Sequence, residues 1–128
     1  MDKDSGTHPV ELLQAIEKRV LWLSSYMIHH ANHIRPNQDG LKIGGHQASS
    51  ASLVSIMTTL WFSILHNEDR VAVKPHAAPV YHAIHYLLGN RTKTALEKFR
   101  AIGGVQSYPS RTKDFDDVDF STGSVGLG

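Results

Sequence analysis

The sequence contains no cysteine, almost no net charge and no long apolar run. The absence of cysteine excludes a disulfide framework and thiolate chemistry, and it suits a cytoplasmic protein. Thirteen basic side chains against twelve acidic ones leave a net charge of +1, which gives no electrostatic reason to expect nucleic acid or an anionic membrane as partner. No segment approaches the roughly 18 consecutive apolar residues of a membrane span, and the polar N-terminus does not resemble a signal peptide. We therefore expect a cytoplasmic globular protein that binds neither nucleic acid nor membrane.

Length and composition predict one small domain. The chain has 128 residues, of which 41% are apolar, enough to build a core. We expect residues 1–9 to form a loose arm and residues 10–128 to form the domain. The sequence ends in the glycine-rich stretch "STGSVGLG", and such stretches usually lead into further structure. We therefore expect the chain to be a truncated part of a longer protein.

Apolar periodicity predicts a mainly helical chain. A stripe with spacings of three and four predicts a first helix over residues 10–34, and Pro36 and Gly40 end it. The stripe consists of Leu12, Leu13, Ile16, Val20, Leu23, Met27 and Ala31. Residues 35–45 are predicted to form a loop. A second helix is expected over residues 47–65, and its large apolar side chains, which include Ile56 and Ile64, are expected to be buried.

The second half of the chain is predicted to begin with a short strand. Val71–Lys74 is β-branched and follows the turn "NEDR", which favours a buried strand. A third helix is predicted over residues 76–88 and is ended by Gly89. Thr92 is expected to cap a fourth helix that runs to Arg100, and residues 101–128 are predicted to be mostly loop.

Nine histidines are many for this length, and two pairs have helical spacing. His29 and His33 are four residues apart, and His82 and His85 are three apart, so each pair could face a metal ion. No third ligand stands at a diagnostic spacing, which favours packed or solvated histidines.

An acidic run near the C-terminus raises the question of calcium. It consists of Asp114, Asp116, Asp117 and Asp119. An EF-hand needs an oxygen ligand at its fifth position and glycine at its sixth, where this chain has Val118 and Asp119. We favour a solvated loop and predict no metal-ligating residue in the chain.

His46 and His76 are different, because each stands at a predicted helix start. His46 follows two glycines and His76 follows "KP". Two helix N-termini led by histidine would suit an anionic ligand whose chemistry needs proton transfer. Histidines also occur at helix starts without any function, so the spacing alone leaves both interpretations open.

Several short motifs occur in an order that resembles a known family. They are "GGHQASSAS", "AVKPHAAPVYHAIHYLLG", "LEKFR", "SYPSR" and "FSTGSVGLG". Together they resemble the diphosphate-binding domain of thiamine-diphosphate enzymes of the transketolase superfamily, and most closely the branch of homodimeric pyruvate dehydrogenases. The resemblance covers about residues 10–128. It implies an α/β fold, here the truncated front end of a three-layer domain that is mostly helical with one short strand.

The resemblance implies roles for individual residues. His46 matches a histidine beside the reactive thiazolium, and His76 matches a second active-site histidine. Ser49 matches a serine that lies near the cofactor. Lys74 and Pro75 depart from the residues that precede this second histidine in the family, so substrate details do not carry over.

Two further segments distinguish the branches of the superfamily. Tyr108 in "SYP" matches a tyrosine near the cofactor in pyruvate dehydrogenases, where transketolases have "GHP" with a catalytic histidine. Ser124, Val125 and Gly126 match the segment whose backbone approaches the cofactor, an approach that glycine permits.

The resemblance also implies cofactors and partners. Thiamine diphosphate would be held with Mg²⁺, but the metal motif, "GDG" followed by an asparagine, does not occur in these 128 residues. The glutamate that activates the aminopyrimidine belongs to another domain, and family active sites form between the subunits of a homodimer. The implied partners are a small 2-oxo acid or ketose phosphate and, for a pyruvate dehydrogenase, a lipoyl acyltransferase component. We expect the chain alone to be inactive.

Three functions therefore remain open. The first is part of an enzyme for oxidative decarboxylation of pyruvate or a similar 2-oxo acid. The second is transketolase-like ketol transfer between sugar phosphates. The third is a non-catalytic helical interaction module derived from the same fold.

Overall fold

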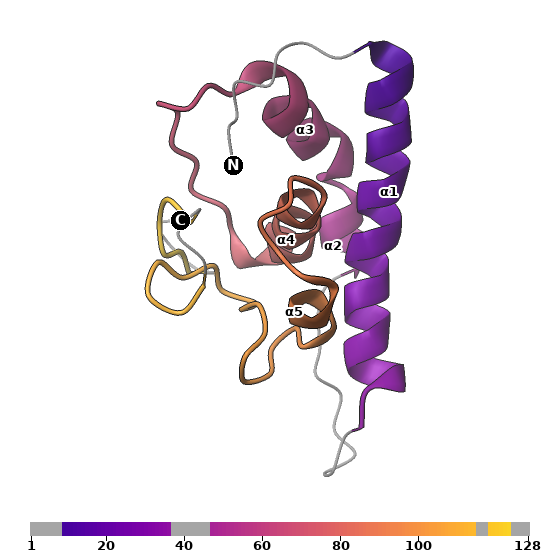
Figure 1. Ribbon diagram of the computed structural model, residues 1–128, viewed down its shortest axis with the longest axis vertical. Coiled ribbons are helices and arrows are strands. Elements are labelled where there is room, and N and C mark those ends of the chain that lie inside the picture. The colour runs from indigo at the N-terminus through magenta and orange to yellow at the C-terminus, as the bar shows by residue number, and fades with distance from the viewer. Residues whose placement is uncertain (1–8, 37–46, 115–117, 124–128) are drawn as a thin grey trace.

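A computed structural model describes residues 9–36, 47–114 and 118–123, and this part of the chain is mostly helical (Figure 1). Apart from Pro9, the predicted N-terminal arm lies outside the described residues. The longest helix, α1, spans Val10–His29 and continues as a π-helical turn, η1, over His30–Ile34. Arg35 then takes an extended conformation before Pro36, as expected for a residue that precedes proline. The predicted helix over residues 10–34 is confirmed.

The apolar stripe of α1 is buried over its second half. Val20, Leu23, Met27 and Ala31 are buried, whereas Leu12 near the N-terminal end is 44% exposed. Figure 1 shows α1 along one side of the molecule, with α2, α3 and α4 packed against its inward face.

The predicted second helix is confirmed as helical but is broken once. α2 spans Gln47–Ala51, α3 spans Val54–Thr59, and a π-helical turn, η2, covers Leu60–Ile64. At the break the hydroxyl of Ser52 donates to the carbonyl of Ser49, which competes with the helical hydrogen-bond pattern.

The buried face of this segment differs from the expected one. Val54, Met57 and Trp61, which recur at spacings of three and four, are buried together with Phe62, whereas Ile56 and Ile64 are 59% and 54% exposed. The expected burial of these two isoleucines is therefore wrong, because the stripe that includes the two large aromatic side chains faces the core instead.

The predicted strand Val71–Lys74 is also wrong: the described residues contain no strand. The segment precedes η3 without pairing to a neighbouring strand, and its polar backbone groups bond to side chains instead. The amide of Val71 donates to Asp119, and the carbonyl of Val73 accepts from the hydroxyl of Thr122. Backbone amides and carbonyls need hydrogen-bond partners, and in this segment side chains supply the partners that a neighbouring strand would supply in a β-sheet.

The third predicted helix is confirmed. It begins with a 3-10 turn, η3, over Pro75–Ala77 and continues as α4 over Ala78–Leu87. Gly89 ends it with φ +89°, its amide donating to Tyr86 and that of Asn90 to His85. This is a Schellman motif, in which glycine adopts the left-handed conformation without strain. α4 contacts α1, α2, α3 and α5 and forms the centre of the molecule.

The fourth helix, α5, is shorter than predicted and spans only Lys93–Glu97. Its predicted cap is confirmed, because Thr92 Oγ1 accepts from the amide of Ala95. After the helix the chain turns back: the amide of Arg100 donates to the carbonyl of Val105, with Arg100 at φ 66°. A Cβ on Gly104 would come within 2.0 Å of the Lys98 carbonyl oxygen, so glycine is required at this turn.

Two apolar clusters hold the helices together. The first surrounds α4 and includes Leu23, Trp61, Val80 and Ile84. The second joins the end of α1 and η1 to α5 through residues such as Met27, Ala31, Leu96, Phe99 and Val105. Tyr86 packs against both clusters. Among the described helices, none is both long and apolar enough to cross a membrane.

Candidate functional site

Two segments far apart in sequence lie together on the side of the molecule away from α1 (Figure 1). We call residues 70–76 and 106–123, as far as they are described, the loop face. The amide of Val71 donates to Asp119 Oδ2 at 2.9 Å. Thr122 Oγ1 donates to the carbonyl of Val73, and Lys74 Nζ donates to the carbonyl of Gly123 at 3.3 Å. The segment that leads to His76 is thus joined to the segment that leads to Ser124.

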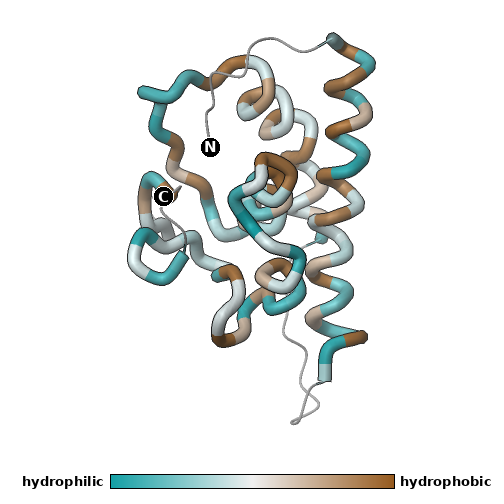
Figure 2. Tube along the Cα trace, in the orientation of Figure 1, coloured by the Kyte–Doolittle hydropathy of each residue, from teal (hydrophilic) through white to brown (hydrophobic). Residues whose placement is uncertain are grey.

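The loop over residues 106–114 is organised by one carboxylate. Asp114 accepts from the amide of Gln106 at 3.0 Å through Oδ1 and from the amide of Ser110 at 2.8 Å through Oδ2. Figure 2 shows this loop in mostly hydrophilic colours, in contrast to the apolar positions that recur along the helices. The hydrogen bonds to Asp114 therefore fix the shape of this loop together with Pro109, whose side chain is fully buried.

The same loop is bonded to the C-terminal segment. The amide of Arg111 donates to Ser121 Oγ at 3.0 Å, and the amide of Thr122 donates to the carbonyl of Pro109 at 3.4 Å. The "SYPSR" segment, the "KPH" segment and the residues before Ser124 therefore meet on one face.

The helix that carries Ser49 is also close to His76, because α2 contacts η3. The side-chain amide of Gln47 donates to the carbonyl of Ser25 at 3.4 Å and holds the start of α2 against α1. The first turn of α2 and the start of α4 therefore lie on neighbouring parts of the surface.

The structure places three of the predicted site residues on the surface. Ser49 and His76 are exposed, and the side chain of Tyr108 is 46% exposed. His46, Ser124, Val125 and Gly126 lie outside the described residues. The structure brings together the segments that carry Ser49, His76 and Tyr108, and the roles of all seven residues stay predictions.

Ser50 is a polar residue that the sequence analysis missed. Its side chain is 1% exposed, and its hydroxyl has no hydrogen-bond partner among the described residues. A buried hydroxyl without a partner is costly and needs an explanation. Its neighbour Ser49 is the residue that the sequence singled out.

His82 and His85 are packed histidines of the core, as favoured from the sequence. His82 is fully buried, with Nε2 2.8 Å from the carbonyl of Gln106 and Nδ1 3.5 Å from Nε of Arg91. A carbonyl only accepts and a guanidinium only donates, so this pattern fits a neutral ring with its proton on Nε2. His82 therefore links the centre of α4 to the beginning of the loop face. This contact spans 24 positions, and no local pattern reveals it.

The other metal candidates have ordinary structural contacts. The rings of His29 and His33 lie 5.0 Å apart on the exposed side of the helix. Asp114 and Asp119 direct carboxylate oxygens at backbone amides, as a polar loop requires. Within the described ranges, no group of three or more histidine, aspartate or glutamate side chains is placed to hold a metal ion.

Comparisons with known proteins give one similarity of limited extent. No family model matches the chain, and no solved structure matches it significantly. The sequence is 28% identical over 132 aligned residues to a protein described as pyruvate dehydrogenase E1 component, from Haemophilus influenzae. The alignment covers 96% of this chain but only 14% of that protein. The chain is thus similar, along nearly its whole length, to a short part of a pyruvate dehydrogenase E1 component.

Proposed function

We propose that the chain is the front part of the thiamine-diphosphate-binding domain of a longer enzyme. The enzyme cleaves a carbon–carbon bond next to a carbonyl group, in the oxidative decarboxylation of pyruvate or a similar 2-oxo acid. The observation that carries this proposal is the similarity to pyruvate dehydrogenase E1 along 96% of the chain.

The loop face supports the proposal. An active site built from short motifs needs distant segments to converge, and three of the motif segments are joined there by hydrogen bonds. The contact between α2 and η3 adds the segment of Ser49. Convergence of this kind is what a composite cofactor site requires.

The described residues fit thiamine diphosphate in one respect. The residues that immediately precede Ser124 are held against the segment of His76. Ser49 and the backbone of Ser124, Val125 and Gly126 would hold the cofactor. When bound, thiamine diphosphate supplies a nucleophilic carbon and an electron sink for carbon–carbon cleavage. Mg²⁺ would be held by residues outside this sequence.

His46, His76 and Tyr108 are the proposed catalytic residues. His76 follows Pro75 at the start of the helical segment that continues as α4, and its exposed imidazole is the kind of group that serves enzymes as general acid or base. His46 would serve in the same way at the start of α2. The phenol of Tyr108 would orient the substrate as a hydrogen-bond donor.

The proposed partners follow from the same enzyme class. They are a small 2-oxo acid as substrate, a second copy of the parent protein and a lipoyl acyltransferase component, in a cytoplasmic setting.

Ketol transfer between sugar phosphates is the second candidate, because two cations belong to the loop face. Lys74 directs its ammonium group at the carbonyl of Gly123, and Arg111 is exposed in the loop over residues 106–114. Either cation could neutralise a substrate phosphate. Tyr108 argues against ketol transfer, because a phenol is less suited than the imidazole of a histidine to bind a phosphorylated sugar.

The test compares kcat/KM of the full-length parent protein for pyruvate and for xylulose 5-phosphate, with thiamine diphosphate and Mg²⁺ present. We expect a clear preference for pyruvate. A clear preference for the sugar would replace the proposed reaction by ketol transfer, and activity on neither would refute both.

A further inference from the structure

A groove of about 430 Å³ lies between α1, the end of α4 and α5, and all of its lining residues belong to these helices and their ends. Its walls include Trp22 and Tyr26 from α1 and Leu87 from the end of α4. None of the lining residues belongs to the loop face, so this groove is separate from the candidate cofactor site. The proposed function gives it no role.

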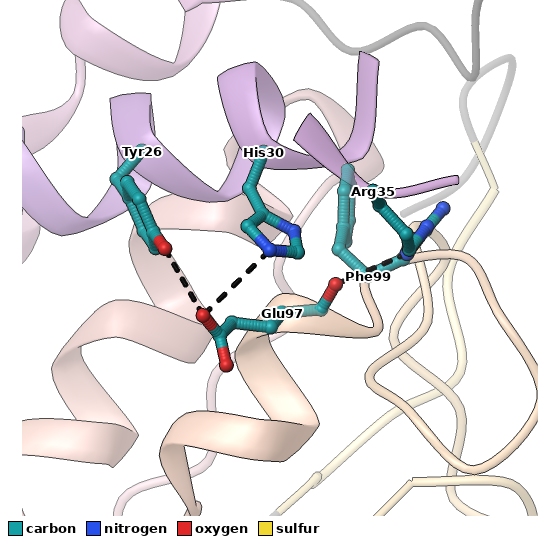
Figure 3. A network of polar contacts seen from close by, with 5 residues as sticks. All are labelled: Tyr26, His30, Arg35, Glu97 and Phe99. Atoms are coloured by element: carbon teal, nitrogen blue, oxygen red, sulfur yellow. Dashed lines mark hydrogen bonds and ion pairs between the residues drawn. The ribbon is translucent and has the colours of Figure 1, made fainter. Parts of the chain in front are cut away.

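The most exposed large aromatic side chain of the groove is held in a fixed position. Trp22 is 58% exposed, yet its ring stacks on Tyr26 with 5.1 Å between centroids and 6° between planes. Tyr26 is itself fixed, because its hydroxyl donates to Glu97 at 3.0 Å (Figure 3). An exposed but preorganised tryptophan loses little conformational entropy on binding, and tryptophan is enriched at binding hot spots.

The charges at the groove favour an acidic ligand. Arg19 from α1 and Lys93 from α5 both line it. The carboxylate at the groove, Glu97, is engaged by Tyr26 and lies 3.7 Å from Nε2 of His30, as Figure 3 shows. A carboxylate that enters the groove therefore meets two cations, while the acidic group already present is turned towards its own partners.

We propose that this groove binds an amphipathic helical segment of a separate protein. Its large apolar side chains pack against Trp22 and Leu87, and its acidic residues face Arg19 and Lys93. A mainly apolar groove between helices is a usual receptor for such a helix, and the apolar side chains that line this one include Trp22, Leu23, Leu87 and Leu96. The charge pair sets the orientation of the segment and the preference for acidic over basic partners.

The test uses the full 128-residue chain and a synthetic helical peptide with leucines at i, i+3, i+4 and i+7 and glutamates beside them. Calorimetry gives the affinity, and acrylamide quenching of tryptophan emission reports the site, because Trp61 is 3% exposed and Trp22 dominates the accessible signal. We expect saturable binding that protects Trp22 from the quencher.

Charge reversal then tests the assigned contacts. Arg19→Glu or Lys93→Glu should weaken binding about tenfold or more, whereas Lys18→Glu, an exposed neighbour outside the groove, should not. Circular dichroism checks that each variant stays folded. The proposal is overturned if a peptide with lysines in place of glutamates binds equally well, if Lys18→Glu weakens binding as much as Lys93→Glu, or if no peptide binds. It is also overturned if Trp22 is already shielded in the peptide-free chain at high concentration, since a second copy would then occupy the groove.

Discussion

The helical body and the loop face differ in the balance between apolar packing and hydrogen bonds. Within the helical body, defined as α1 to α5 with the turn over residues 98–105, apolar side chains from distant segments interlock, and Phe99, Val105 and Ile84 are at most 1% exposed. In the loop face, Val73 and Val118 still pack into the first apolar cluster, but the segments are also joined by side chains that bond to backbone, namely those of Asp114, Asp119 and Thr122. Apolar packing fixes a helix firmly but offers little chemistry. A polar framework leaves neighbouring side chains such as His76 exposed, and the proposed site residues lie there.

We expect the largest loss of stability from a substitution in the helical body. Phe99→Ala removes a ring that is 1% exposed in the second apolar cluster, and we expect it to lower the free energy of unfolding by about 3–5 kcal/mol. Ile102→Ala, at a side chain that is 98% exposed, is the matched control and should change it by less than about 0.5 kcal/mol. Chemical denaturation monitored by circular dichroism measures both. Equal effects would mean that α5 is not packed as described.

A smaller and local effect is expected in the loop face. Asp114→Ala leaves the amides of Gln106 and Ser110 without their acceptor and should cost about 1–2 kcal/mol. Because the variant removes the acceptor of these two amides alone, hydrogen exchange should accelerate at them and not in α4.

The exposed neighbour Lys113→Ala is the control for this loop and should leave both amides protected. If Asp114→Ala also exposed the amides of α4, the loop face and the helical body would form one cooperative unit, and the contrast between them would not hold.

We expect the smallest change in stability from a substitution at the contact between α1 and α5. The hydrogen bond from Tyr26 to Glu97 raises the pKa of this tyrosine above 10.0, and burial and the negative charge of Glu97 act in the same direction. The unfolded chain releases this proton first, so the contribution to stability is fully present below pH 10 and is lost as the pH rises above it.

Glu97→Gln should lower the pKa of Tyr26 towards its ordinary value and remove that loss of stability at alkaline pH. Ultraviolet difference titration, with Tyr26→Phe used to assign the signal, measures the shift. An unchanged titration in Glu97→Gln would show that the contact does not persist in solution.

The two regions also differ in how far the sequence predicts them. The helices over residues 10–34 and 76–88, the cap at Thr92 and the stop at Gly89 were predictable, because periodicity and capping are local signals. The break at Ser52 was not, because a serine that bonds to a carbonyl three residues back leaves no pattern in apolar spacing. The expected burial of Ile56 was wrong for another reason: two apolar stripes with helical spacing exist in this segment, and the one that contains Trp61 faces the core.

The contacts of the loop face could not be predicted, because they join residues 48 or 49 positions apart. Val71–Lys74 has the composition of a strand, yet Asp119 and Thr122 bond to it where a second strand was expected. Of the acidic run, Asp116 and Asp117 lie outside the described residues, and nothing in its sequence reveals that Asp114 holds the amides of Gln106 and Ser110. The candidate site residues were identified from short sequence motifs. The position of His76 at a predicted helix start would not by itself have distinguished a functional histidine from a structural one.

Steady-state kinetics of His76→Ala in the full-length parent protein is the most direct test of the central claim that the loop face belongs to a thiamine-diphosphate site. With pyruvate as substrate we expect kcat to fall about 100- to 10,000-fold, the usual cost of losing a proton-transfer or charge-stabilising group. The thermal transition should stay nearly unchanged, because His76 is exposed, and His33→Ala, also exposed, should retain full activity. Unchanged turnover in His76→Ala would contradict the claim.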